Sequence, residues 1–499
     1  MRCHCFEPLQ PYNREINRNQ FMNIGRYMLK LLVKKSLKKL NYIHVYQWVT
    51  FSVLFCLSLI FYHERLLADS GYYLMRMINY QMPWIEHGRY ILLFSQLLPW
   101  LGVSLHLHLK VVLILFSINH VLFHFLIFYL SVYRFKNLMA GVFIILLQVA
   151  GLVTGFMVPM FELYYAASML VLFAVILFSK KINTVYLWIL MFLAFFIISS
   201  HPMGIFMLIV VVGFYGLDFG MKGIHIHLYL GVLLAGLLLF KFFTASEYES
   251  GKTSAILQNL NNGKYNEAYF SGLGHFLFKN YISIAILAVI VSLLITYQKA
   301  YRKLLLYLSA ILLVIALSIL NTGTFDFSRY NEQVWFPLVF VVCFPLMTIS
   351  GKIAGRKLSV FLYVLLVLFT VYRLWMIAGN GLLYTQRTNT MRQVVEHAQQ
   401  YESRKFIVND SLLTKGGVPG PNWSYPIETM FISAEKGKEY CISICTTEDY
   451  YFNDVYKQLD TTNYLFRRFE VEPLTNLNSF YFRLDSGNYQ PIHLPNKDN

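Results

Sequence analysis

The chain has 499 residues, of which 57% are hydrophobic and only 14% charged, and its mean hydropathy is +0.50. About a quarter of the residues of a typical soluble domain are charged, so this composition argues against a soluble protein and favours one embedded in a membrane. The net charge of +16 would suggest a nucleic-acid partner in a soluble domain, but here the basic residues flank apolar segments, as they do around membrane helices. We therefore expect membrane lipids as partners, and no nucleic acid.

The first 44 residues carry nine Lys or Arg and no long apolar run. This pattern predicts a basic cytoplasmic segment without a cleavable signal peptide. From Met22 onward the segment is basic and amphipathic, and we expect that part to lie on the inner membrane surface.

Residues 45–378 contain continuous apolar runs, which predict transmembrane helices because lipid leaves backbone polar groups no partner outside the segment. The predicted fold class is an all-α polytopic membrane protein. The apolar segment 90–104 is too short to span and is expected to lie in the interface or to re-enter the membrane. We predict about eleven spanning helices, at 45–62, 109–133, 138–157, 161–179, 184–200, 203–217, 226–244, 280–297, 303–320, 333–349 and 358–378.

The loops between these helices differ in charge from one side of the membrane to the other. With a cytoplasmic N-terminus, every inner loop carries Lys or Arg, as the positive-inside rule requires. The outer segments then include a large first loop, 63–108, and everything after about residue 379. Acidic residues gather on this outer side: Glu64, Asp69, Glu86, Glu162, Glu247, Glu249, Asp326 and Glu332.

Residues 379–499 are polar and mixed in sign, and we predict a small extracytoplasmic α/β domain there. The pattern favours a helix at 385–405 and strands at 406–408 and 440–445.

The first outer loop holds the first group of candidate site residues, Asp69, Tyr72, Glu86 and Arg89. Asp69 and Ser70 are placed to form the N-cap of a helix at 71–80. Asp69 could do no more than cap that helix, or it could act as a general base or metal ligand at the boundary of water and lipid. The sequence leaves both interpretations open.

Three further candidates fall at other outer helix ends. Glu162 opens a helix, where the dipole favours an anion, and His201 lies at the next outer end. These two could share a divalent metal ion, the one cofactor that the sequence suggests. Arg329 lies in a late outer loop and is suited to a phosphate or diphosphate group, because a guanidinium can bind such a group bidentately.

This pattern resembles the GT-C class of polytopic glycosyltransferases, which includes protein O-mannosyltransferases and lipid A aminoarabinose transferases. The resemblance covers residues 45–378 and depends on an acid in the first large outer loop (Asp69), an acid between helices three and four (Glu162) and an arginine in a late outer loop (Arg329). Many members carry an adjacent acidic pair in the first loop, whereas here Asp69 is followed by Ser70.

The resemblance implies transfer of a sugar from a polyprenyl-phosphate-linked donor to a glycan, lipid or protein acceptor on the extracytoplasmic face. Asp69 would deprotonate the acceptor, Glu162 with His201 would hold a metal or orient the base, and Arg329 would neutralise the leaving phosphate. Tyr72 and its aromatic neighbours would offer a surface for sugar stacking. The default location is the inner membrane of a bacterium.

Two other functions stay open at this point. A transporter for a lipid-linked saccharide would show charged or broken helices at mid-membrane, whereas the polar residues here cluster at outer helix ends. A non-catalytic subunit for envelope assembly would use the outer domain to bind a partner.

Overall fold

The computed structural model describes residues 42–492 apart from short internal gaps. The described residues from Gln47 onward belong to one compact unit. The predicted basic N-terminal segment up to residue 41 lies outside the described residues. The internal gaps are 180–181, 221–223, 245–246, 248–250, 252–253, 255–257, 262–263, 323–327, 350–355 and 411–421.

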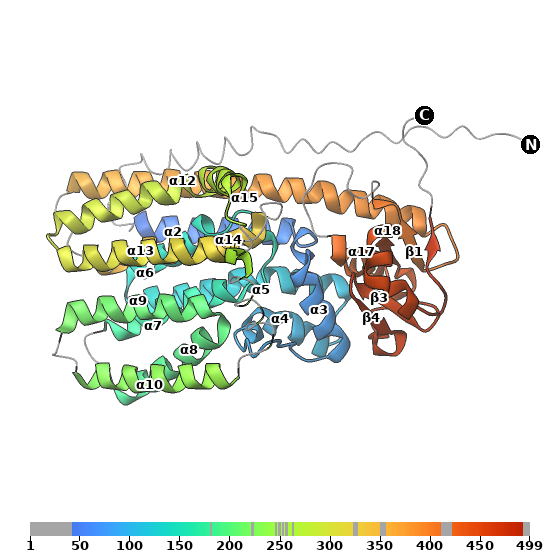
Figure 1. Cartoon of the computed structure of the whole chain (residues 1–499), viewed down its shortest axis with the longest axis horizontal. Helices are drawn as coiled ribbons and strands as arrows, with labels where there is room; N and C mark the ends of the chain where they lie inside the picture. Colours follow the sequence, from blue (N-terminus) through green and yellow to red (C-terminus); the bar gives the residue numbers. More distant parts are fainter. Residues whose placement is uncertain are drawn as a thin grey trace, which may run out of the picture. The chain divides into compact units, whose positions relative to one another are not determined.

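Apolar helices dominate the described residues (Figure 1). Seven of them are long and apolar enough to cross a membrane, which is compatible with the predicted integral membrane protein. These are α2 (Tyr42–Ile60), α5 (Leu109–Tyr129) with the adjoining π-helical turn η3 (Leu130–Arg134), α9 (Pro202–Phe219), α12 (Glu267–Tyr297), α13 (Tyr301–Asn321), α14 (Ser328–Ile349) and α15 (Arg356–Ala398).

Five further apolar helices are shorter or have a shorter apolar part. All eleven predicted segments fall on helices, but the count of eleven spans stays a prediction. Segment 90–104 forms a helix of 13 residues, about 20 Å long, which is less than the thickness of a hydrocarbon core. The five are α4 (Leu92–Ser104), α6 (Leu138–Ala150), α7 (Glu162–Leu177), α8 (Thr184–Ser200) and α10 (Ile224–Phe243).

The predicted helix at 138–157 is wrong in its second half, because α6 ends at Ala150 and the chain turns before a short 3-10 helix, η4 (Gly155–Met157). Two buried charged side chains satisfy the backbone at this break. Arg373 of α15 donates to the carbonyls of Val149 and Ala150 at 3.0 and 2.6 Å. Glu332 of α14 accepts from the backbone N–H groups of residues 153, 154 and 155 at 3.0, 3.1 and 2.7 Å. These contacts pair five backbone groups at the break, which lowers the cost of ending the helix among buried residues.

Replacing Glu332 by Gln should destabilise the protein by about 2–3 kcal/mol. Both carboxylate oxygens accept from backbone N–H groups, so the amide NH₂ of Gln would face a donor in either orientation. The melting temperature of the purified protein, followed by scanning fluorimetry, measures the effect. The matched control is Glu396→Gln, since that side chain is 63% exposed, and equal melting temperatures for both variants would contradict the role of Glu332.

The C-terminal region, residues 379–492, begins inside α15, which continues to Ala398. Its main sheet is parallel with strand order β2-β1-β5, and β3 and β4 form a separate antiparallel hairpin. The predicted helix at 385–405 is thus the end of α15, and the predicted strand at 440–445 begins three residues later. The elements are β1 (Lys405–Val408), α17 (Tyr425–Ala434), β2 (Ser443–Thr446), α18 (Thr447–Tyr451), β3 (Asn463–Arg467), β4 (Glu470–Pro473) and β5 (Gln490–Pro491).

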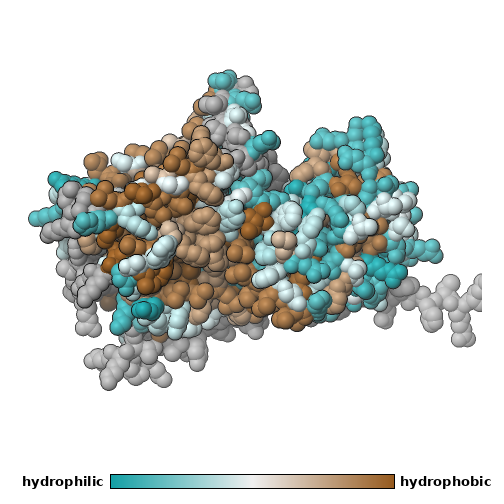
Figure 2. All heavy atoms as spheres, turned by 90° about the horizontal axis from the view of Figure 1, so that it is seen from below, coloured by the Kyte–Doolittle hydropathy of each residue, from teal (hydrophilic) through white to brown (hydrophobic). Residues whose placement is uncertain are grey.

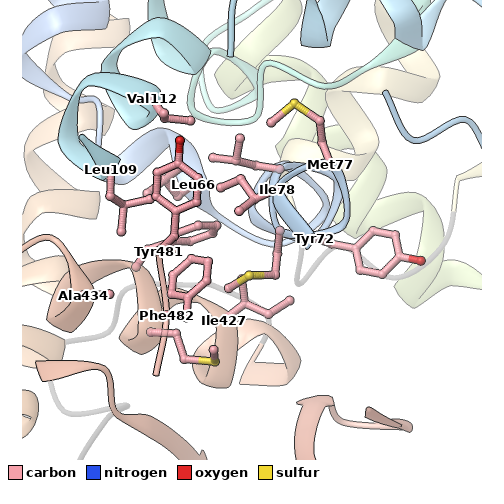
Figure 3. Close-up of a cluster of buried hydrophobic side chains, with 14 of the residues drawn as sticks. Leu66, Tyr72, Met77, Ile78, Leu109, Val112, Ile427, Ala434, Tyr481 and Phe482 are labelled. Carbon is pink, nitrogen blue, oxygen red and sulfur yellow. The ribbon is translucent and has the colours of Figure 1, made fainter. Parts of the chain in front are cut away.

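The first loop and the C-terminal region share one hydrophobic core, although about 350 residues separate them in sequence. Its centre is α3 (Asp69–Tyr80), a helix of the first loop. Figure 3 shows Ile78 of α3 in one cluster with Tyr481, Phe482 and Ile427 of the C-terminal region. Leu74, Met75, Met77 and Ile78 are fully buried, so α3 would expose a large apolar surface without the C-terminal region.

Polar contacts reinforce the same junction. Arg76 of α3 is 5% exposed and donates to Glu472 at 2.5 Å and to Glu470. His63 Nε2 lies 2.7 Å from Glu435 of the C-terminal region. Together with the shared core, these contacts fix the first loop against the hairpin of β3 and β4.

The hydropathy of the surface differs between the helical part and the C-terminal region. Figure 2 shows hydrophobic side chains over much of the helical part of the molecule, and hydrophilic side chains gathered over the C-terminal region. The junction between first loop and C-terminal region therefore lies at the border of an apolar and a polar surface, which is where the predicted site residues occur.

Candidate functional site

A cavity of about 540 Å³ lies between the ends of several apolar helices, the first loop and the C-terminal region. The structure brings six of the seven predicted site residues together in its lining. The seventh, Arg329, is in the first turn of α14 next to the lining residue Tyr330, and its side chain lies outside the described residues. The six are Asp69, Tyr72, Glu86, Arg89, Glu162 and His201.

Asp69 is the first residue of α3, so the prediction that it caps this helix is wrong. The N-cap position is Ala68, and its side chain makes no capping hydrogen bond. Ala68 has φ 53° and ψ −121°, a backbone conformation that costs a non-glycine residue energy. The next turn is equally tight, since a Cβ on Gly71 would lie 2.4 Å from the carbonyl oxygen of Leu66. This turn directs Asp69 to the cavity, at the positive end of the helix dipole.

Glu86 is held by hydrogen bonds from aromatic side chains. The indole of Trp84 donates to it at 3.0 Å, Tyr73 donates at 3.3 Å, and Tyr72 also donates. Burial alone would raise the pKa of Glu86, but the hydrogen bonds from Trp84 and Tyr72 outweigh it and the pKa is lowered. Burial and the bond to Glu86 raise the pKa of Tyr72 to about 12. At neutral pH Glu86 is therefore an ionised acceptor that orients two phenols of the cavity wall.

Glu162 lies in the first turn of α7 and forms an ion pair with Arg89, whose side chain is 10% exposed. The pair links the first loop to the helical body. His201 caps α9, because its Nδ1 accepts from the backbone N–H of Met203 at 3.2 Å.

The predicted metal site needs ligands that can converge on one ion. One oxygen of Glu162 is engaged by Arg89 and one nitrogen of His201 by a helix N-terminus. Across the described ranges, no group of three or more His, Cys, Asp and Glu side chains is placed to hold a metal ion. Each of the two side chains thus has one donor atom already engaged, and the metal site stays a prediction.

The phenol of Tyr73 lies within the electrostatic influence of three carboxylates. Burial raises the pKa of this phenol, and the charges of Glu162, Glu86 and Asp69 raise it further. Three carboxylates from two separate segments of the chain therefore act on one side chain. This is a convergence that spacing in the sequence does not reveal.

The sequence missed the part of the lining that comes from the C-terminal region, namely Trp423, Arg467 and Phe469. The last two lie where β3 turns into β4. The only local signal is the Arg-Arg-Phe-Glu run at 467–470, and nothing in it indicates that the hairpin meets the first loop. Ser318 of α13 and Gln333 of α14 were also missed.

No family model, curated protein or solved structure matched the chain when we compared them with it. The chemistry of the cavity is therefore the basis for a functional assignment.

Proposed function

We propose that this protein is a membrane glycosyltransferase of GT-C type. It would move a sugar from a polyprenyl-phosphate-linked donor to an acceptor hydroxyl on the extracytoplasmic face. The observation that carries the proposal is the shared cavity, which holds Asp69 and the Arg89–Glu162 pair at the border between apolar helices and a hydrophilic region. A lipid-linked sugar needs such a place, because its lipid stays among apolar helices while its sugar meets a polar acceptor.

In the proposed reaction the acceptor oxygen attacks the anomeric carbon of the donor sugar and forms the new glycosidic bond. The bond between that carbon and the phosphate oxygen breaks, and the polyprenyl phosphate leaves with the electron pair. The hydroxyl proton moves to the carboxylate of Asp69, which acts as general base.

Two other charged groups have distinct roles in this proposal. Glu162, fixed by Arg89, places a negative charge near the sugar carbon, where positive charge develops in glycosyl transfer. Arg329 would stabilise the charge on the leaving phosphate.

The proposed location is the inner membrane of a bacterium, with the N-terminus in the cytoplasm and the cavity facing outward. The charge of the predicted loops supports this orientation, since Lys and Arg occur in every inner loop.

Purified protein in proteoliposomes tests the proposal directly. We expect it to convert radiolabelled polyprenyl-phosphate-linked hexoses into polyprenyl phosphate and a glycosylated product when a membrane extract supplies the acceptor. Heat-treated protein is the control for spontaneous hydrolysis. Movement of the labelled lipid between leaflets with its glycosyl bond intact would instead show a transporter, and no turnover of any of the hexose donors would contradict the enzyme.

A further inference from the structure

The tip of the β3–β4 hairpin presents an exposed aromatic side chain to the cavity. Phe469 is 52% exposed although it is large and apolar, and it lines the cavity together with Arg467. Its ring centroid lies 6.5 Å from that of Trp423, with the two planes at 44°. The two rings thus form an angled aromatic surface that comes entirely from the C-terminal region.

The tip is held rigidly. Arg467 donates through Nε to Glu470 on the other side of the turn. Its guanidinium carbon lies 4.1 Å from the ring centroid of Tyr72 and 4.6 Å from that of Phe469. Glu470 also accepts from Arg76 of the buried helix α3, so the tip is tied to the shared core.

We propose that Phe469, Trp423 and Arg467 form the subsite that binds a pyranose ring of the acceptor. The C–H face of a pyranose is apolar and can cover the exposed ring of Phe469, while N–H groups of the Arg467 guanidinium donate to its hydroxyls. This deepens the proposed function and rests on it, because a saccharide acceptor must lie beside the donor sugar in the same cavity.

Charge favours a neutral sugar at this subsite. Asp69, Glu86 and Glu162 line the cavity against the guanidiniums of Arg89 and Arg467, so carboxylates outnumber guanidiniums. The Arg467 guanidinium is paired with Glu470, so the subsite itself does not need an anionic sugar. The assignment to the acceptor follows from position, since the donor must stay near the apolar helices that anchor its lipid, whereas these three residues belong to the hydrophilic region.

The test is binding of neutral disaccharides to the full chain in nanodiscs, measured by saturation-transfer NMR with maltose, cellobiose and chitobiose. We expect at least one to bind the wild type, and Phe469→Ala to weaken that binding about 10-fold, as the loss of one apolar contact face would. Phe469→Trp should retain it. The matched control is Tyr451→Ala, which removes an aromatic side chain of the same region that is 59% exposed and is not part of the cavity lining.

The proposal is overturned if the wild type binds none of the three disaccharides, or if Phe469→Ala binds them as tightly as Tyr451→Ala does. Binding needs no turnover, so this outcome is distinct from failure of the transferase. If saccharide binding follows Phe469 but no donor is turned over, the subsite stands and the proposed enzyme does not.

Discussion

Replacing Asp69 by Asn should lower the rate of sugar transfer about 10²–10⁴-fold, the range that a positioned general base contributes. The change keeps the size of the side chain and removes only its ability to take the acceptor proton. Because Asp69 begins α3 without capping it, the helix and the core around it should stay intact. The measurement is the initial rate of transfer in proteoliposomes at matched protein amounts, with the melting temperature recorded in parallel.

The control for this variant is Asp485→Asn, which removes a carboxylate of the C-terminal region that is 59% exposed. It should transfer sugar at the rate of the wild type. Transfer by the Asp69 variant at the same rate as this control would remove Asp69 from the mechanism. Loss of transfer together with a lower melting temperature would instead assign Asp69 a structural role.

The sequence predicts the helices well because each depends on a local property, a continuous apolar run of sufficient length. Loop charge predicts that Asp69, Glu86, Glu162 and His201 lie on one side of the membrane. Helix ends on one side of a packed bundle lie at one level, and the structure does bring these four residues to one cavity. Most of the candidate site could therefore be predicted without knowing a single tertiary contact.

Features that depend on non-local contacts could not be predicted. The segment after Ala150 is apolar enough for a helix, and it turns because Glu332 and Arg373 from distant helices satisfy its backbone. Local sequence rules predict Asp69 as the N-cap of its helix, whereas the helix begins one residue earlier, after the turn at Ala68. The hairpin carrying Phe469 reaches the cavity only through contacts between α3 and a region about 400 residues later.

Arg65 connects the two segments that carry the carboxylates. It is fully buried and lies on a short 3-10 helix, η2 (Glu64–Leu66), four residues before Asp69. It donates to the carbonyl of Phe156 at 2.5 Å, in the turn that leads to Glu162, and to the carbonyl of Ser117 at 3.3 Å. Burial lowers its pKa to about 9, so it is charged at neutral pH. All the partners that these contacts give it are neutral, which makes a buried cation costly.

Burying this cation lowers the stability of the fold, yet Arg65 contacts both segments that carry the carboxylates. We therefore expect Arg65 to position Asp69 relative to Glu162 at the expense of stability. Arg65→Met roughly keeps the length and removes the buried charge, but it also removes the donor to two buried carbonyls; the two effects oppose each other, so its melting temperature should stay close to that of the wild type. The turnover number should nevertheless fall about 100-fold, because a displacement of about 1 Å between reacting groups is enough for such a loss. The KM for the donor should change little, since no donor contact is removed. If the variant melts at a lower temperature and loses activity only in proportion to the unfolded protein, Arg65 merely stabilises the fold. If its turnover number is unchanged, the two carboxylates keep their geometry without Arg65.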